Sequence, residues 1–171
     1  MNKSEFKWQL KNGILKIKEE KDFSKLVILC IGTDKIIGDC FGPLVGTKLL
    51  RKIGNIDNVD IFGTIDSTIG FDNIYNYLNI IDEKNDCILV IDSAVSNYTH
   101  IGKVCIANRP IILGKGINKK GVEIGDISIR AIVGQDKKMP RNNFEILRNI
   151  SLGFVMNLAD IVSDGIAEII V

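Results

Sequence analysis

The chain has 171 residues, of which 46% are hydrophobic and 25% are charged, and its formal net charge is +1. These values favour a single compact domain over residues 1–171 with a full apolar core. A nearly neutral chain gives no electrostatic basis for binding nucleic acid or a membrane surface. No stretch resembles a signal peptide or the roughly 20 apolar residues of a membrane span, so we expect a cytoplasmic protein.

The first quarter of the chain contains an extension, a strand, a loop and a helix. Residues 1–25 are charged and irregular, and we expect a partly helical N-terminal extension packed on the main body. The apolar run that follows predicts a strand over 26–32. A glycine-rich loop over 33–42 then leads to a helix that begins at Pro43, whose missing N–H suits a first helical turn, and ends at Gly54.

The remaining elements alternate along the chain. Apolar runs bounded by turn residues predict strands over 59–63, 86–92, 101–107 and 128–134. Apolar periodicity predicts helices over 71–82 and 142–163, and the tail over 166–171 is expected to add a short strand. The glycine-rich stretch 114–125 is the least regular part of the chain.

This alternation predicts a three-layer α/β/α fold with a mostly parallel central sheet of about five strands. The first, third and fifth strands are nearly continuous apolar runs, as expected when helices cover both faces of a sheet. We expect the strand order 2-1-3-4-5, in which strands 1 and 3 are neighbours and their connections leave toward opposite faces. Open α/β sheets place their sites at such a switch point.

Two aspartates follow these neighbouring strands. Asp39 lies in the loop after the first strand, and Asp92 ends the third. The topology brings both carboxyls to one crevice, and paired carboxylates in a dry cleft commonly perform acid–base chemistry near neutral pH. We therefore predict Asp39 and Asp92 as catalytic residues. Each has an alternative role as the cap of a turn or a helix.

Other residues near the predicted crevice are candidates for substrate binding, namely Gly38, Gly42, Ser67, Thr68 and Ser93. The three hydroxyls would position a substrate carbonyl, and N–H groups of the two glycines would hold a tetrahedral oxyanion. The glycines of this loop match neither common phosphate-binding motif. Two further polar residues, Asp126 and His100, precede strands and are expected at the opposite rim of the sheet.

The four cysteines have no zinc-ligand spacing, and we expect neither a metal nor a cofactor. Three of them lie in apolar runs and are expected to act as small hydrophobes: Cys30, Cys87 and Cys105. Cys40 differs because it follows Asp39 in the loop. A nucleophilic role for Cys40 would need a histidine partner, and His100 is the single histidine of the chain.

Three segments carry a resemblance to a known family. They are Ile31-Gly32-Thr33-Asp34 with Gly38-Asp39-Cys40-Phe41-Gly42-Pro43-Leu44-Val45-Gly46-Thr47, Val90-Ile91-Asp92-Ser93-Ala94, and Gly125-Asp126-Ile127-Ser128-Ile129. Together they resemble the YyaC sporulation proteins over residues 24–165. That family is similar to the germination protease of spores and, more remotely, to the hydrogenase maturation proteases. All are α/β proteins with a largely parallel central sheet.

The resemblance implies a sporulation-associated peptidase. The germination protease is an aspartate-dependent peptidase of small acid-soluble spore proteins, and its Asp-Ala-Leu-Gly-Pro and Ile-Asp-Ala segments correspond to the segments around Asp39 and Asp92. The implied substrate is a peptide or a small acid-soluble spore protein, in the cytoplasm of the spore-forming cell or in the spore.

Two alternatives stay open. One is a catalytically silent peptide-binding sporulation factor on the same fold, and the other is a metal-dependent hydrolase with Glu123 beside the two aspartates. Maturation proteases hold a metal with two acids and a downstream histidine, and the corresponding stretch 120–125 has no histidine. A homo-oligomer also stays open, since either the 114–125 loop or a neighbouring subunit would close the crevice.

Overall fold

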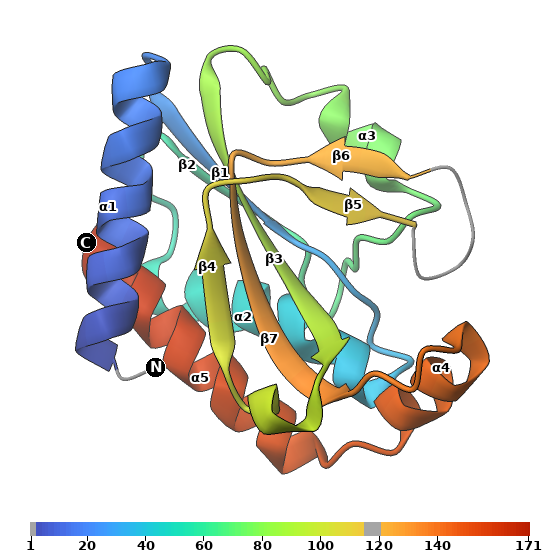
Figure 1. The fold of residues 1–171 in the computed structure, drawn as a ribbon. Helices are drawn as coiled ribbons and strands as arrows, with labels where there is room; N and C mark the ends of the chain where they lie inside the picture. The colour runs from blue at the N-terminus through green and yellow to red at the C-terminus, as the bar shows by residue number, and fades with distance from the viewer. Residues whose placement is uncertain (1–2, 115–120) are drawn as a thin grey trace.

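The computed structural model describes residues 3–114 and 121–171, which are built around a five-stranded sheet in the order β2-β1-β3-β7-β4 (Figure 1). Its strands are β1 (Lys25–Cys30), β2 (Val59–Phe62), β3 (Asp86–Ser96), β4 (Val104–Ala107) and β7 (Ile127–Gln135). A second sheet pairs β5 (Ile111–Leu113) with β6 (Val122–Ile124). The helices are α1 (Lys3–Glu20), η1 (Ile37–Cys40), α2 (Phe41–Ile53), α3 (Ile74–Leu78), η2 (Tyr98–His100), α4 (Pro140–Arg148) and α5 (Leu152–Ile170).

Helices α1, α2 and α5 cover one face of the sheet, and α3 with the β5–β6 hairpin covers part of the other (Figure 1). The central strands are therefore buried on both faces, and Leu29, Ile91 and Ile129 are fully enclosed. Strands β2, β1, β3 and β7 run parallel. The predicted α/β/α fold with a mostly parallel sheet of five strands is confirmed.

The predicted strand order is wrong at one edge. Strand β7 lies between β3 and β4, and β4 runs antiparallel to it, with Val104 opposite Ala131. Residues 97–103, which connect β3 to β4, are too few for the crossover of a dozen or more residues that a parallel neighbour needs. The chain therefore turns back after β3, and the start of β4 lies at the rim where the parallel strands end.

The predicted helices differ from the observed ones in extent. Residues 3–20 form a regular helix rather than an irregular extension, because Phe6, Leu10 and Ile17 recur at helical spacing and are buried. Helix α3 spans only Ile74–Leu78, which is shorter than the predicted 71–82.

The helix predicted over 142–163 is in fact two helices, α4 and α5, which meet at 86°. Ile150 lies in the break and packs over β7, where a Cβ on Gly134 would come 3.2 Å from its Cδ1 atom. The tail predicted as a strand belongs to α5 as far as Ile170. It stays helical because Gly165 packs against the ring of Phe6, which ties α5 to α1.

Among the helices of the described residues, no single one is long and apolar enough to cross a membrane. The bent pair of α4 and α5, taken together, meets both criteria by length and composition only. Residues 115–120 of the glycine-rich stretch 114–125 lie outside the described residues.

Candidate active site

The loop after β1 folds back tightly over the end of its own strand. Gly32 has a φ of 142°, and a Cβ at this position would lie 2.0 Å from the carbonyl oxygen of Asp39. A Cβ on Gly42 would lie 2.1 Å from the carbonyl oxygen of Ile31. Only glycine permits these approaches. The loop thereby brings Asp39, in η1, over the rim of the sheet next to β3.

Strand β3 carries the second aspartate past the end of β1. The prediction that Asp92 ends its strand is wrong, because β3 continues to Ser96. Its last residue paired with β1 is Ile91, so Asp92 begins the part that extends beyond β1. Because β7 accompanies β3 to Gln135, this extension keeps strand geometry.

A hydrogen bond joins the loop after β1 to strand β3 at this rim. Ser93 Oγ donates to Asp39 Oδ1 across 3.4 Å, and the backbone N–H of Thr33 also donates to the Asp39 carboxylate. Both aspartates are half-buried. The predicted switch point therefore does bring Asp39 next to the segment that holds Asp92.

The electrostatics of the two carboxyls are coupled. Burial and, to a lesser extent, the negative charge of Asp39 raise the pKa of Asp92 to about 8, against smaller opposing effects of the Ser93 N–H and of Arg130. Burial also raises the pKa of Asp39, but hydrogen bonds from Thr33 and Ser93 favour its ionised form. The surroundings therefore favour the protonated form of Asp92, whereas the hydrogen bonds to Asp39 favour its ionised form.

Arg130 is a site residue that sequence reasoning missed. It lies on β7 directly opposite Asp92 in the register of the sheet, and it is half-buried. One signal was available, since Arg130 is the single charged residue in the otherwise apolar run 127–134 and charged residues are rarely buried without a reason.

The thiol and imidazole candidates do not form a nucleophile–base pair. Cys40 is buried, and its burial with the charges of Asp34 and Asp39 raises the pKa of its thiol, which disfavours the nucleophilic thiolate. His100 is exposed, and its Nδ1 atom lies 3.4 Å from Ser96 Oγ. The prediction that His100 lies at the far rim is wrong, because β4 runs antiparallel and begins at the same rim as the aspartates.

Two further expectations concern residues away from the aspartates. Asp126 does lie at the opposite rim, where it accepts the Ile88 N–H at 2.8 Å and pairs with Lys21 at 2.9 Å. Cys30 and Cys87 are buried as predicted, whereas Cys105 is exposed because its side of the edge strand β4 is uncovered.

The predicted substrate-binding residues have mixed surroundings. Gly38 packs against Leu147 of α4, whose Cδ2 atom would lie 2.7 Å from a Cβ on the glycine. Ser67 Oγ lies 3.3 Å from Tyr77 Oη, and the Thr68 carbonyl accepts from Asn73 Nδ2 at 2.9 Å. Ser93 alone of this set has a described hydrogen bond to an aspartate of the pair, and substrate binding by all five residues stays a prediction.

The residues do not form a metal centre of three ligands. In the parts of the chain that the structure describes, no group of three or more His, Cys, Asp or Glu side chains is arranged to hold a metal ion. Glu123 is exposed on β6, where it pairs in register with Ile112.

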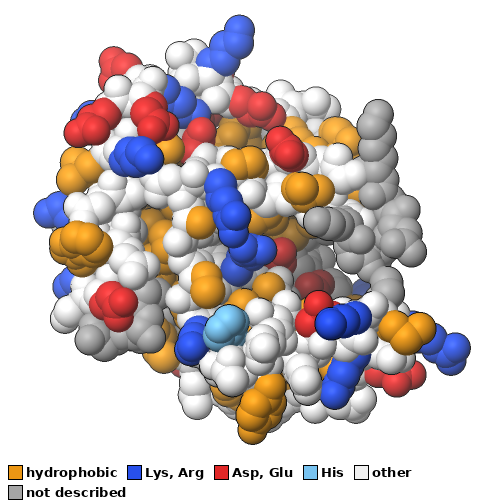
Figure 2. Space-filling model, viewed as in Figure 1, with side chains coloured by type: hydrophobic (Ala, Val, Ile, Leu, Met, Phe, Trp, Pro, Cys, Tyr) orange, Lys and Arg blue, Asp and Glu red, His pale blue; other side chains and the backbone are white. Residues whose placement is uncertain are grey.

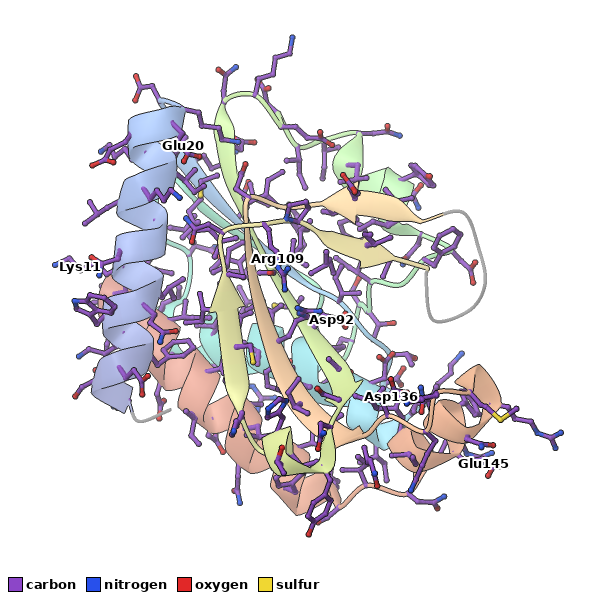
Figure 3. All side chains as sticks on the ribbon, viewed as in Figure 1. Lys11, Glu20, Asp92, Arg109, Asp136 and Glu145 are labelled. Carbon is purple, nitrogen blue, oxygen red and sulfur yellow. The ribbon has the colours of Figure 1, made fainter. Side chains whose placement is uncertain are left out.

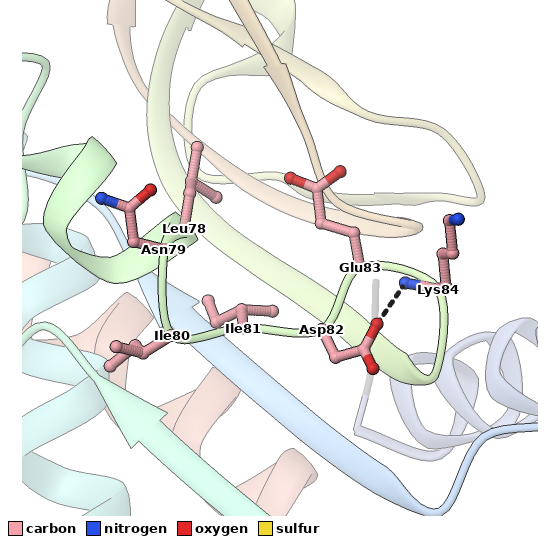
Figure 4. A pocket seen from close by; sticks show the side chains of 7 residues that line it. All are labelled: Leu78, Asn79, Ile80, Ile81, Asp82, Glu83 and Lys84. Carbon is pink, nitrogen blue, oxygen red and sulfur yellow. Dashed lines mark hydrogen bonds between the residues drawn. The ribbon is translucent and has the colours of Figure 1, made fainter.

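A pocket of about 530 Å³ lies elsewhere, in the loop that leads into β3 (Figure 4). It is lined by residues 78–84, and the Lys84 N–H donates to Asp82 Oδ1 at 3.1 Å within its wall. Since this loop precedes β3, the pocket belongs to the rim opposite Asp92 and takes no part in the candidate site.

Comparison with known proteins places the chain in a family. The family model described as "Protein of unknown function (DUF1256)" matches residues 1–165. The chain is 31% identical over 144 residues to the "Uncharacterized protein YyaC" of Bacillus subtilis (strain 168), covering 83% of this chain and 68% of that protein.

Among solved structures, the chain is similar to the NiFe hydrogenase maturation protease HycI from Thermococcus kodakarensis KOD1. The TM-score is 0.57, the identity is 21%, and the match covers 86% of this chain and 92% of that chain. At this identity the likeness concerns the fold, which is therefore that of a hydrogenase maturation protease. On the evidence of the family model and of the Bacillus relative, the chain belongs to the DUF1256 family.

Proposed function

We propose that this protein is a peptidase in which Asp39 and Asp92 act as an acid–base pair. The observation that carries the proposal is the coupling of two half-buried carboxyls at one rim, where the charge of Asp39 and burial raise the pKa of Asp92. Such a pair presents a proton donor and a proton acceptor together at neutral pH. The maturation-protease fold is consistent with this chemistry, although a fold alone does not establish an activity.

The two aspartates have different roles in this mechanism. Asp92, which keeps its proton, donates it to the carbonyl oxygen of the scissile peptide. Asp39, ionised and held by the Ser93 hydroxyl and the Thr33 N–H, takes a proton from the attacking water. The water oxygen bonds to the carbonyl carbon, and a neutral tetrahedral diol forms.

The diol then breaks down, and the proton at each aspartate moves in the opposite direction to that of the first step. Asp39 gives its proton to the amide nitrogen as the carbon–nitrogen bond breaks, and one hydroxyl of the diol returns a proton to Asp92. The products are a carboxylic acid and an amine, and both aspartates regain their starting protonation states. Ionisation of Asp92 at high pH removes the proton donor and stops the cycle.

The substrate we propose is a peptide or a small acid-soluble spore protein, with a role in sporulation. This rests on the resemblance of the segments around Asp39 and Asp92 to those of the YyaC proteins and the germination protease. The location that follows is the cytoplasm of a spore-forming cell or the spore itself.

Incubation of the pure protein with small acid-soluble spore proteins, followed by mass spectrometry of the products, tests the proposal. We expect fragments from the parent chain and none from Asp39→Asn or Asp92→Asn. Asp34→Asn is the matched control, because Asp34 is an exposed aspartate of the same loop. A stable complex without fragments would instead support a silent peptide-binding protein, and cleavage by either variant of the pair would exclude the mechanism.

A further inference from the structure

Arg130 carries a positive charge beside the aspartate pair that the described residues do not neutralise. Across the sheet, Asp92, Arg130 and Cys105 form one row, with Arg130 in the middle. The salt bridges of the described residues do not include Arg130. Its neighbour Asp92 keeps its proton at neutral pH and therefore supplies no full negative charge. A half-buried guanidinium in this position favours an anionic partner from outside the chain.

A second arginine approaches the same place from a different part of the fold. Arg109 lies in the connection between β4 and β5, and its side chain points over the sheet toward Asp92 (Figure 3). Arg109 is exposed, and it too is absent from the salt bridges of the part of the chain that is described. Figure 2 shows Lys and Arg side chains on this face beside a hollow that contains acidic side chains.

The spacing of the row decides where an anion would lie. Adjacent strands are about 5 Å apart, so Arg130 and Asp92 leave the sheet from neighbouring positions on the same face, and a group bound to Arg130 lies near the Asp92 carboxyl. A carboxylate is the planar anion that matches the fork of a guanidinium, and two guanidiniums hold it better than one. In a peptide, a carboxylate comes from an acidic side chain or from the C-terminus.

We propose that Arg130 and Arg109 bind a carboxylate of the substrate next to the bond that the aspartate pair cleaves. This rests on the proposed peptidase function and adds the substrate class, which is a peptide with an acidic side chain or a free C-terminus close to the scissile bond. The arginines thereby select and orient the peptide, while the aspartates perform the proton transfers.

Binding of short peptides tests this selection independently of cleavage. One probe pair consists of blocked alanine pentapeptides with a central Glu or a central Gln. A second pair consists of alanine pentapeptides with a free or an amidated C-terminus. Affinity is measured by NMR titration of the parent chain at pH 6, where Asp92 is protonated. We expect the charged member of at least one pair to bind about tenfold more tightly, and the responding pair identifies the source of the carboxylate.

Charge-removing variants assign the effect to the two arginines. Arg130→Gln and Arg109→Gln should each remove most of the preference for the charged member, whereas Arg51→Gln, an exposed arginine of α2, should retain it. Arg130→Gln raises the pKa of Asp92 further, because the guanidinium opposes the protonated state, so Asp92 stays protonated at pH 6 in this variant.

The outcomes separate this inference from the proposed function. Charge-selective binding without any cleavage would uphold the arginine site and contradict the peptidase. Equal affinity for the charged and neutral probes would overturn the arginine site even if the protein cleaves peptides. A preference that survives in both arginine variants, or is lost equally in Arg51→Gln, would also overturn it.

Discussion

Replacing Asp92 by Asn should stabilise the folded protein, and the gain should depend on pH. Burial and the charge of Asp39 raise the pKa of Asp92 from 3.8 to about 8. Between these values the unfolded carboxyl ionises while the folded one stays protonated. The contribution of Asp92 to stability is therefore fully present below about pH 4 and is lost as the pH rises toward 8.

The magnitude follows from the span of this window. Each pH unit above 3.8 costs about 1.4 kcal/mol of the free energy of unfolding, so the roughly three units to pH 7 amount to about 4 kcal/mol. This value is an upper bound, because Asp92 is only half-buried and water screens its charge. An amide is neutral at every pH and keeps the shape of the carboxyl, so Asp92→Asn avoids this cost.

Urea unfolding of the parent chain and of Asp92→Asn between pH 3.5 and 8 measures the difference. We expect the two free energies of unfolding to be equal within about 0.5 kcal/mol at the acid end and to diverge by roughly 2–4 kcal/mol at pH 7, with the variant more stable. Asp34→Asn, at an exposed position, should follow the parent chain throughout. A difference that is flat with pH, or a variant that is less stable at pH 7, would refute the reasoning.

Three other predictions concern the loop, the far rim and the reaction. Gly42→Ala should lower the free energy of unfolding by more than about 2 kcal/mol, because its Cβ would meet the Ile31 carbonyl at 2.1 Å, whereas Gly70→Ala, with open space around it, should change little in the same urea assay. Lys21→Gln should cost about 1 kcal/mol by breaking the partly buried pair with Asp126, without shifting the pH profile of cleavage. Peptide cleavage by the parent chain should decline above about pH 8, where Asp92 ionises, and undiminished cleavage at pH 9.5 would contradict this.

The parallel core of the fold could be predicted from sequence because its signals are local. The strands β1, β3 and β7 are apolar runs with few interruptions, and Pro43 and Gly54 lie close to the two ends of helix α2. Parallel topology then fixes the rim where Asp39 and Asp92 meet. That both aspartates lie at one rim could be predicted for this reason, without knowledge of any contact, while their catalytic role stays a prediction.

The missed features depend on contacts between distant residues. Either β7 or β4 could lie beside β3. The apolar pattern within each strand does not indicate which of the two does so. The break between α4 and α5 depends on Ile150 packing over Gly134, and Arg130 enters the site only because β7 lies next to β3. Tertiary packing decided each of these cases.

The central claim is that one proton is shared by two coupled carboxyls, and carboxyl ¹³C NMR titration of the aspartates tests it most directly. In the parent chain, Asp92 should titrate near pH 8. In Asp39→Asn the pKa of Asp92 should fall, because the negative charge of Asp39, which disfavours ionisation of Asp92, is gone while burial remains. An Asp92 signal that titrates near pH 4, or that is unchanged by Asp39→Asn, would contradict the pair and with it the proposed chemistry.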